Sequence, residues 1–178
     1  MTSKKNILAI VGSAGKKSSN LSLVKRIKKL TAKYFNVIIF DKLASLPHFN
    51  TELSVDNTPK KILALRAMIA KADGVIICTP EYVFSIPSGL KNVLEWCVSA
   101  TVFSDKPVGI ITASLDGRKG HEELQLIMKT IGAAFNEETT LLIQGIKAKF
   151  DENGNLKDDR VVENLNSFII HFEKLIGL

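Results

Sequence analysis

The segment CTPEYVFSIPSGLKN, residues 78–92, decides the fold of this 178-residue chain. It follows the apolar run GVIIC at 74–78, which is typical of a buried strand, and it leads into an amphipathic run from Leu90 to Trp96. Its two prolines restrict the backbone where the chain leaves the strand and enters the helix. In an open α/β sheet, ligands bind at such carboxyl ends of strands. The segment is therefore a candidate wall of a ligand site.

The alternation of strand-like and helix-like segments continues along the whole chain. Five apolar runs have the composition of buried strands: residues 6–11, 36–41, 74–78, 107–113 and 139–144. Helix-like patterns with one apolar face begin near residues 20, 59, 90, 121 and 158. This alternation, in a chain of this length, predicts a single α/β domain over residues 1–178, built on a doubly wound parallel sheet.

Three polar connections follow strands of the predicted sheet. They are residues 12–20 after the first strand, 80–85 after the third and 114–120 after the fourth. Right-handed crossovers bring the carboxyl ends of parallel strands to one edge of the sheet, so we expect the three connections to lie together. Three weak local signals then define one candidate site.

The first connection has the composition of a phosphate-binding loop. It joins a strand to a helix start, where unpaired backbone N–H groups and the helix dipole attract an anion. Its sequence, GSAGKKSSN at 12–20, matches neither the Gly-x-Gly-x-x-Gly pattern of dinucleotide sites nor the Gly-Lys-Ser/Thr pattern of nucleoside triphosphate sites. It suits a monophosphate, with hydrogen-bond donors at Ser13, Ser18, Ser19 and Asn20 and positive charge at Lys16 and Lys17. Loop and cap roles alone are the alternative for Ser13 and Ser18.

The net charge of +6 comes partly from the helix-like segment KRIKK at 25–29 and from Lys33. A solvated helix face accounts for these cations, and a general attraction for phosphate-bearing small molecules accounts for them equally well. Neither a groove-reading motif nor a run of aromatics accompanies them, so we expect no nucleic-acid partner.

Cysteine, histidine and apolar patterns limit the other classes. Cys78 and Cys97 belong to no CxxC or CxxH pattern, which favours two buried free thiols. The three histidines are far apart in the sequence and predict no metal site. The apolar runs are much shorter than the roughly 20 residues of a membrane span, and the N-terminal segment lacks a signal-peptide pattern. We therefore expect a cytoplasmic protein without a membrane partner.

The motifs in these connections resemble one known family, the NAD(P)H-dependent FMN reductases, with the related quinone, chromate and azo-dye reductases. The family motif Gly-Ser-x-Arg-x-x-Ser-x-Asn is matched at Gly12, Ser13, Ser18 and Asn20. A second motif, Pro-Glu-Tyr-Asn-x-Ser-x-Pro-x-x-Leu-Lys-Asn, is matched at Pro80, Glu81, Tyr82, Ser85, Pro87, Leu90, Lys91 and Asn92. The acidic-Trp pair that often follows is present at 95–96, and a Ser- and Gly-rich loop is matched less faithfully at 114–120. The resemblance covers nearly the whole chain, and the second motif is highly specific.

The resemblance implies a flavodoxin-like fold, with five strands in the order 2-1-3-4-5 and helices on both faces. It implies bound FMN as the cofactor and NADPH or NADH as the hydride donor, with hydride passing through flavin N5 to FMN, a quinone or another small acceptor. It also implies a homodimer or homotetramer. Because the cofactor carries the chemistry, we assign no catalytic acid or base and no metal ligand.

Carried over by position, the cofactor-binding residues fall into three groups. The FMN phosphate is expected at Ser13, Ser18 and Asn20, assisted by Ser19 and Lys16. The isoalloxazine ring is expected along Pro80, Glu81, Tyr82, Val83 and Ser85. The other side or edge of the ring is expected at Ser114, Leu115, Asp116 and Gly117.

Two positions depart from the family pattern, and they bear on FMN affinity rather than on FMN identity. Gly15 stands where the family commonly has Arg, and Val83 stands where it has Asn. Arg118 and Lys119 are candidates for binding the phosphates of the nicotinamide cofactor, or are solvated loop charges. Trp96 is expected to pack in the core or at a subunit contact rather than on the flavin.

Two other functions remain open. A flavodoxin-type electron carrier binds FMN but reacts with protein partners, and such carriers are generally acidic, whereas this chain carries a charge of +6. An FMN-binding protein that has lost reductase activity is the other alternative. The second motif favours the reductase.

Overall fold

The computed structural model describes residues 4–13, 15 and 18–178. Parallel strands form one five-stranded sheet in the order β2-β1-β3-β4-β5, which confirms the flavodoxin-like topology expected from the sequence. The strands are β1 (Lys5–Val11), β2 (Phe35–Phe40), β3 (Gly74–Thr79), β4 (Val108–Ser114) and β5 (Thr140–Gln144).

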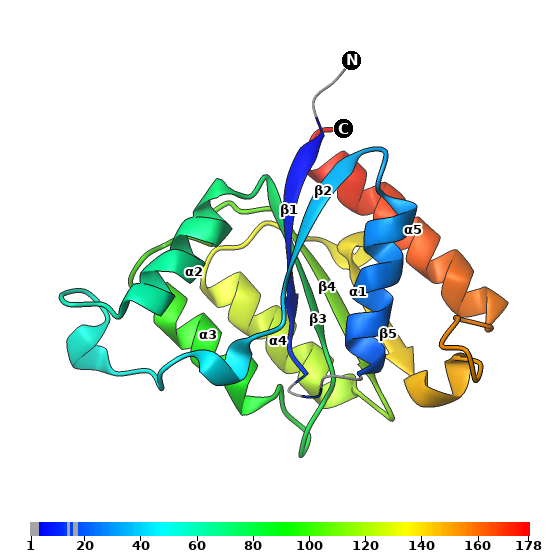
Figure 1. The fold of residues 1–178 in the computed structure, drawn as a ribbon, viewed down its shortest axis with the longest axis horizontal. Helices are drawn as coiled ribbons and strands as arrows, with labels where there is room; N and C mark the ends of the chain where they lie inside the picture. The colour runs from blue at the N-terminus through cyan, green and yellow to red at the C-terminus, as the bar shows by residue number, and fades with distance from the viewer. Residues whose placement is uncertain (1–3, 14, 16–17) are drawn as a thin grey trace.

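Helices connect the strands and cover both faces of the sheet. They are α1 (Ser19–Leu30), α2 (Lys60–Lys71), α3 (Ser88–Val98), α4 (Arg118–Thr130) and α5 (Asp159–Leu175). Short 3-10 turns, η1 (Leu43–Ser45), η2 (Thr51–Leu53), η3 (Glu137–Thr139) and η4 (Ile146–Lys149), punctuate the connections. Figure 1 shows α1 and α5 on one face of the sheet and α2, α3 and α4 on the other.

The strand sequences are apolar because side chains on both faces are buried. Alternate residues of β1 point to opposite cores: Ile7 and Ala9 join the core under α1 and α5, whereas Leu8 and Ile10 join the core under α2, α3 and α4. Every residue of β3, at the centre of the sheet, is buried. A strand covered on both faces has this continuous apolar composition rather than an alternating one.

The carboxyl ends of the strands meet at the lower edge of the sheet in Figure 1. The strand order changes direction between β1 and β3, which is the topological switch point where open α/β sheets bind ligands. The backbones approach closely there: a Cβ atom at Gly12 would lie 2.2 Å from Oγ1 of Thr79. The glycine after β1 is therefore required by packing.

Part of the second motif supports a long connection rather than the site. The side chain of Asn92 on α3 accepts a hydrogen bond from Phe49 N–H at 2.7 Å and donates one to the Pro47 carbonyl at 3.0 Å. The fully buried Trp96 also donates to the Pro47 carbonyl, at 2.9 Å, and its ring packs edge-on against Phe49. The expectation that Trp96 packs in the core is confirmed.

Two further expectations concern single elements. The last polar connection is shorter than expected, because α4 begins at Arg118 rather than near His121. Gly117 precedes it with a φ of 87°, a left-handed conformation that glycine adopts without strain.

Both cysteines are free and buried, as expected. Among the described residues, the helices are all too short or too polar to cross a membrane.

Candidate functional site

A cavity of about 600 Å³ lies at the switch point. Residues of all three predicted connections line it, so the expectation that these connections converge is confirmed. The lining residues are Ser13, Gly15, Ser18, Ser19 and Asn20 after β1, Pro80 and Tyr82 after β3, Ala113, Ser114 and Leu115 at the end of β4, and Gly145, Ile146, Lys147 and Ala148 after β5.

The connection after β5 was missed by the sequence reasoning. A parallel strand brings its own carboxyl end to the same edge of the sheet, and Gly145 directly follows β5 with a φ of 62°. The N–H of Gly145 donates a hydrogen bond to the Leu115 carbonyl at 3.0 Å, which ties this connection to the one after β4. A glycine at the end of a predicted parallel strand was the signal that could have revealed it.

One end of the cavity consists of hydrogen-bonding groups at the start of α1. Ser18 caps the helix: its backbone is extended, and its hydroxyl oxygen accepts a hydrogen bond from Leu21 N–H at 3.1 Å. The nearly buried Ser13 accepts one from Gly15 N–H at 3.3 Å. The first turn of α1 contains no acidic residue, so the positive end of the helix dipole is not neutralised locally. This end is suited to an anion.

The side chain of Asn20 points into the protein. Its Nδ2 donates a hydrogen bond to the Ala113 carbonyl at 3.1 Å, and its Oδ1 lies 3.3 Å from the thiol of Cys78. Burial raises the pKa of the Cys78 thiol far above its usual range, so the thiol stays protonated and can donate to Oδ1. Asn20 thus links α1 to the ends of β3 and β4.

A tight hairpin at Tyr82–Ser85 follows β3. Tyr82 and Ser85 exchange two backbone hydrogen bonds, of 2.9 and 3.1 Å. The two central residues, Val83 and Phe84, both have positive φ values, 52° and 59°, which is the signature of a type I′ turn. Asn and Gly adopt this conformation with little strain, whereas a β-branched residue does not. Val83 therefore adopts a conformation that Asn would adopt with less strain.

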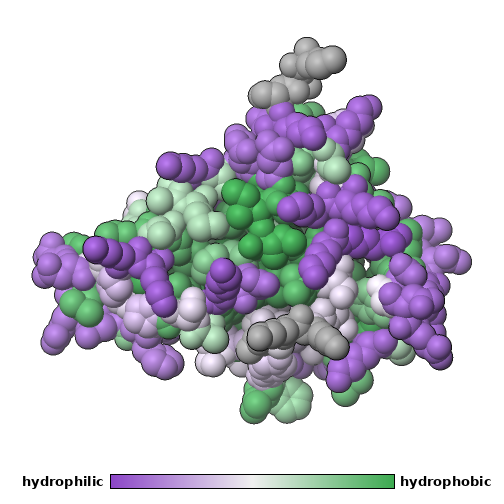
Figure 2. Space-filling view, in the orientation of Figure 1, coloured by the Kyte–Doolittle hydropathy of each residue, from purple (hydrophilic) through white to green (hydrophobic). Residues whose placement is uncertain are grey.

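The hairpin presents apolar side chains to solvent. Val83 is 95% exposed and Phe84 is 74% exposed. A small protrusion at the lower edge of the molecule is hydrophobic in Figure 2, at the position where the β3–α3 connection protrudes in Figure 1. Tyr82, at the base of the hairpin, lines the cavity and is half-exposed.

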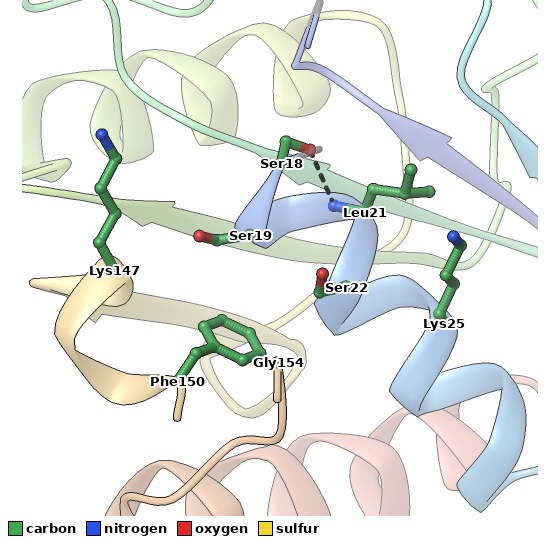
Figure 3. Close-up of a pocket in the computed structure, with 8 residues that line it drawn as sticks. All are labelled: Ser18, Ser19, Leu21, Ser22, Lys25, Lys147, Phe150 and Gly154. Atoms are coloured by element: carbon green, nitrogen blue, oxygen red, sulfur yellow. Dashed lines mark hydrogen bonds between the residues drawn. The ribbon is translucent and has the colours of Figure 1, made fainter. Parts of the chain in front are cut away.

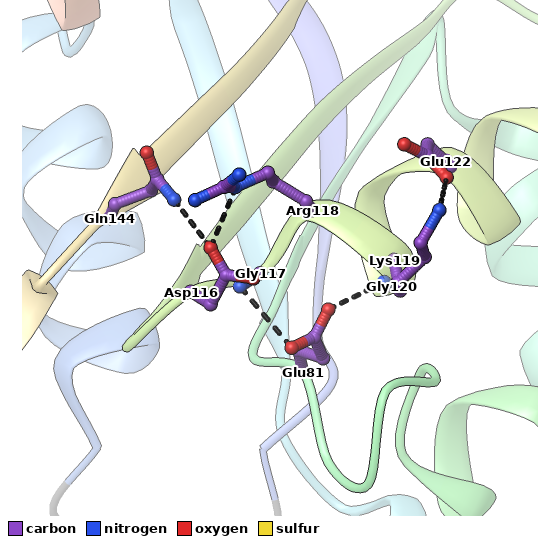
Figure 4. A network of polar contacts seen from close by, with 8 residues as sticks. All are labelled: Glu81, Asp116, Gly117, Arg118, Lys119, Gly120, Glu122 and Gln144. Atoms are coloured by element: carbon purple, nitrogen blue, oxygen red, sulfur yellow. Dashed lines mark hydrogen bonds and ion pairs between the residues drawn. The ribbon is translucent and has the colours of Figure 1, made fainter.

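The carboxylate of Glu81 binds the start of α4 instead of facing the cavity (Figure 4). It accepts hydrogen bonds from Gly117 N–H at 3.3 Å and from Gly120 N–H at 2.8 Å. These are among the N–H groups that an α-helix leaves unpaired at its beginning, and a negative charge is favourable at that position. A side chain at position 120 would crowd Glu81, because a Cβ atom built on Gly120 would lie 3.3 Å from both Cβ and Cγ of Glu81.

A second carboxylate makes the reciprocal connection. Glu123, on the second turn of α4, accepts hydrogen bonds from the Ser85 hydroxyl at 2.7 Å and from Ile86 N–H at 2.9 Å. Glu81, before the hairpin, therefore binds backbone N–H groups of α4. Glu123, on α4, binds residues at the end of the hairpin, so two carboxylates hold the two segments together. Sequence patterns did not single out Glu123, because a glutamate inside a helix is typical of a solvated face.

The predicted site residues divide into two sets. Those that line the cavity are Ser13, Ser18, Ser19, Asn20, Pro80, Tyr82, Ser114 and Leu115. Those that lie beside it, outside its described lining, are Glu81, Val83, Ser85, Asp116 and Gly117. Lys16 and Lys17 lie outside the described residues.

The charged groups after β4 pair with one another on the surface (Figure 4). Asp116 accepts from Arg118 at 2.8 Å and from the Gln144 side chain at 2.6 Å. Lys119 forms an ion pair with Glu122, also at 2.8 Å, with both side chains 63% exposed. Exposed pairs of this kind contribute little to stability, so they leave Arg118 and Lys119 able to change partners.

His121 belongs to the first turn of α4, and its Nδ1 lies 2.9 Å from Oγ1 of Thr112 on β4. Burial lowers the pKa of its imidazole, against a smaller opposing effect of Glu122. Among the described residues, no group of histidine, cysteine and carboxylate side chains is arranged to hold a metal ion.

Fold and cavity together define a flavodoxin-like α/β protein whose cavity is lined by serine hydroxyls at the start of α1 and by Pro80 and Tyr82 after β3. Residues 5–144 match the family model of the NADPH-dependent FMN reductases. The chain belongs to this family.

Individual relatives agree over nearly the full length. The NADH:(hydroxy)cinnamate reductase subunit CrdA of Vibrio ruber is 31% identical over 173 residues, which cover 94% of this chain and 85% of that protein. An NADPH:quinone oxidoreductase of Arabidopsis thaliana is 32% identical over 177 residues, with 94% and 89% covered.

A solved structure agrees in the same way. The flavoenzyme FerB, an NAD(P)H:(acceptor) oxidoreductase from Paracoccus denitrificans, superposes with a TM-score of 0.81 at 26% identity, and the match covers 97% of each chain. The protein is therefore an NAD(P)H-dependent flavin oxidoreductase whose cofactor is FMN.

Proposed function

We propose that this chain holds FMN in the 600 Å³ cavity, with the phosphate at the start of α1 and the ring beside Pro80 and Tyr82, and reduces a small quinone-like acceptor. One observation carries the proposal: the cavity has hydroxyl and amide donors at one end and apolar side chains at the other. FMN has the same division between its phosphate and its isoalloxazine ring. When bound, FMN supplies the hydride chemistry, and the chain supplies position and electrostatics.

At the phosphate end, the hydroxyls of Ser13 and Ser18 each already accept one backbone hydrogen bond. Neither hydroxyl donates to a described residue, and each can donate to a phosphate oxygen because a hydroxyl donates and accepts at once. The described lining contains no carboxylate that would repel the phosphate. Ser19, at the first position of α1, adds a third hydroxyl.

At the ring end, Pro80, Tyr82 and Leu115 form an apolar wall. Glu81 and Glu123 fix this wall by fastening the hairpin to α4. Leu115 is 87% exposed, so it lies at the mouth of the cavity, where an acceptor enters. A planar aromatic acceptor buries its faces against such side chains at little cost in desolvated polar groups.

The acceptor class is supported by the surface around the mouth. Tyr82, Val83, Phe84 and Leu115 are exposed apolar side chains on the two connections that flank the ring end. The relative from Arabidopsis thaliana is named as an oxidoreductase of quinones. A quinone matches the apolar mouth better than a charged acceptor does.

The same exposed side chains support a homodimer or homotetramer, because a contiguous apolar surface on a protein is commonly covered by a partner. We further infer that residues 1–178 act as one domain, supported by the single sheet with its two covering cores. The two free thiols favour the reducing environment of the cytoplasm.

The test is anaerobic reduction followed by oxidation. NADPH and NADH are added separately to the FMN-loaded protein, and the loss of flavin absorbance is followed by stopped flow. We expect rapid bleaching with at least one of them, and recovery of the absorbance when a benzoquinone is added. Bound flavin that neither nucleotide bleaches would contradict the reductase function and favour the electron carrier. Bleaching without recovery by benzoquinone would contradict the acceptor class alone.

A further inference from the structure

The sheet ends at β2, whose outer side has no neighbouring strand among the described residues. A groove of about 320 Å³ lies along this edge, lined by Lys4, Lys28, Ala32 and residues 35–38. It shares no residue with the cofactor cavity. Figure 3 shows the opposite end of α1, where Ser19 and Lys147 border a separate opening. The groove is therefore independent of the flavin site.

The backbone of β2 directs hydrogen-bonding groups to this outer edge. Lys5 lies opposite Phe35 in the parallel register of β1 and β2, and the N–H of Lys5 donates to the Tyr34 carbonyl at 3.0 Å. In such a ladder, successive residues direct their N–H and C=O groups alternately to the two sides of the strand. Even-numbered residues of β2 therefore pair with β1, and Val37 and Ile39 direct these groups outward. No described residue beyond the sheet bonds to them.

The two faces of β2 differ beside the groove. On the side of α1, Val37 is buried, and Lys28 and Ala32 border the opening. On the other side, Ile38 is 55% exposed. Figure 2 shows hydrophobic surface where β2 runs in Figure 1, next to hydrophilic side chains over α1. A strand added at this edge would meet charge on one of its faces and an apolar side chain on the other.

The groove is electropositive. Its lining contains Lys4 and Lys28 and no carboxylate. Within the described part of the chain, neither lysine lies within ion-pair distance of an acidic side chain. The ammonium group of Lys4 donates to the Ala32 carbonyl at 2.6 Å, a neutral acceptor that leaves the positive charge uncompensated. Asp41, which follows β2, lies outside the lining.

The two lysines determine which strand this edge accepts. Lysines at a sheet edge oppose pairing with a second copy of the same chain, because the copy brings the same positive charge to the junction. A strand that carries carboxylates neutralises the lysines instead. The unpaired backbone groups at this edge are the groups that a strand of a partner uses when it extends a sheet.

We infer that the groove binds an extended acidic segment of another protein, which pairs with the outer edge of β2 and adds a strand to the sheet. Because side chains alternate along a strand, the carboxylates of this segment face Lys28 and Lys4 on the side of α1. Apolar residues at the intervening positions cover Ile38. The segment therefore alternates acidic and apolar residues.

Binding of a synthetic peptide tests the inference. The probe is a fluorescein-labelled peptide in which glutamate alternates with valine, about eight residues long so that it spans β2. Its anisotropy is followed at neutral pH and physiological ionic strength as the full-length protein is added. We expect saturable binding that Lys28→Glu weakens about five- to tenfold.

Lys29→Glu is the matched control for net charge. Lys29 is the next residue of α1, is exposed and lies outside the groove. Its substitution makes the same change in net charge and should change the dissociation constant of the peptide less than about twofold, because salt screens exposed charges that are not in contact. Neither variant should alter FMN affinity, so this test is separate from that of the proposed function.

Backbone pairing has a test of its own that leaves the protein unchanged. In the extended peptide, the N–H groups of the glutamates point to one edge and those of the valines to the other. A strand that joins β2 uses only one edge. N-methylation of one series should therefore abolish binding, and N-methylation of the other series should preserve it.

Several results would overturn the inference. Equal weakening by Lys28→Glu and Lys29→Glu, or binding that survives N-methylation of either series, would reduce the interaction to a general attraction between charges. A single-stranded oligothymidylate that binds more tightly than the peptide and displaces it would assign the cations to nucleic acid. A wild-type dimer that Ile38→Glu dissociates in sedimentation would assign the edge to a second copy. Absence of saturable binding would show that the edge accepts no acidic strand.

Discussion

The two ends of the cofactor cavity are constructed in opposite ways. At the ring end, the polar groups satisfy one another: Glu81 accepts two N–H groups of α4, and Glu123 accepts from Ser85 and Ile86. At the phosphate end, Ser18 and Ser19 keep hydroxyl groups that no described residue accepts from. The hydrogen-bonding groups at the ring end thus have partners without a ligand, whereas the hydroxyl donors at the phosphate end gain theirs when a ligand binds.

This difference assigns different tasks to the two ends. A closed hydrogen-bond network holds Pro80, Tyr82 and the hairpin in a fixed position and leaves an apolar surface toward the cavity. Open donors at the start of α1 contribute the specific attraction for an anion. Substitutions at the ring end should therefore act on stability and on ring geometry, and substitutions at the phosphate end on flavin affinity.

The largest expected effect is that of Glu81→Ala at the ring end. It leaves the N–H groups of Gly117 and Gly120 without their acceptor, which should lower the free energy of unfolding by about 1.5–3 kcal/mol. Urea unfolding of the flavin-free protein measures it. Glu122→Ala is the matched control on α4, because it removes only an exposed pair with Lys119 and should lower the free energy of unfolding much less than Glu81→Ala does. Equal losses of unfolding free energy in the two variants would show that the hydrogen bonds of Glu81 stabilise the protein no more than an exposed ion pair does.

At the phosphate end, Ser18→Ala should weaken FMN about tenfold, because it removes a hydroxyl donor and disturbs the cap of α1. Ser22→Ala, one turn further along α1 and outside the cofactor cavity, should leave FMN affinity within twofold. Fluorescence titration measures both. An FMN affinity that does not change in Ser18→Ala would move the phosphate away from the start of α1.

The hairpin tip allows a stabilising substitution. Val83→Asn should raise the free energy of unfolding by about 0.5–1 kcal/mol, because Asn tolerates the left-handed conformation that Val83 adopts with a φ of 52°. Val55→Asn is the matched control: Val55 is also exposed, and its φ is not positive. Thermal unfolding distinguishes the two variants. A hairpin that gains nothing from Asn would mean that partner contacts, rather than backbone strain, govern this position.

The smallest expected effect is a dependence on pH. Burial holds the pKa of His121 below its value of 6.5 in the unfolded chain, so the unfolded chain binds more protons at mildly acidic pH. This contribution to stability is present above pH 6.5 and is lost as the pH falls below it. His121→Gln should therefore reduce the slope of unfolding free energy against pH below 6.5. A slope that does not change would place the acid sensitivity elsewhere.

The fold was predictable because it follows from patterns that every strand repeats. Runs such as residues 74–78 are continuously apolar since both faces of the sheet are covered, and the order of strands and helices follows from their alternation. The start of α4 was predicted three residues late, because Gly117 and Gly120 look like loop residues, whereas Gly117 precedes the helix in a left-handed conformation and Gly120 lies against Glu81.

The site was predictable where one connection carries its own chemistry, as Ser13–Asn20 and Pro80–Tyr82 do. It was not predictable where side chains meet across the fold. The motif resemblance implied that Glu81 lies along the flavin, whereas its carboxylate binds α4. Glu123 carries no local signal that separates it from ordinary surface residues, whereas the connection after β5 carries one weak signal, Gly145 at the end of a predicted parallel strand.

Comparing the dissociation constants of FMN and riboflavin separates the contributions of the two ends of the cavity to flavin affinity. Riboflavin has the ring of FMN and lacks its phosphate, so the ratio of the two dissociation constants isolates the phosphate end. We predict that FMN binds about a hundredfold or more tightly than riboflavin. We also predict that Ser18→Ala reduces this ratio and that Glu123→Gln leaves it unchanged. Riboflavin binding as tightly as FMN, or a ratio that responds to Glu123 rather than Ser18, would contradict the division of tasks between the two ends.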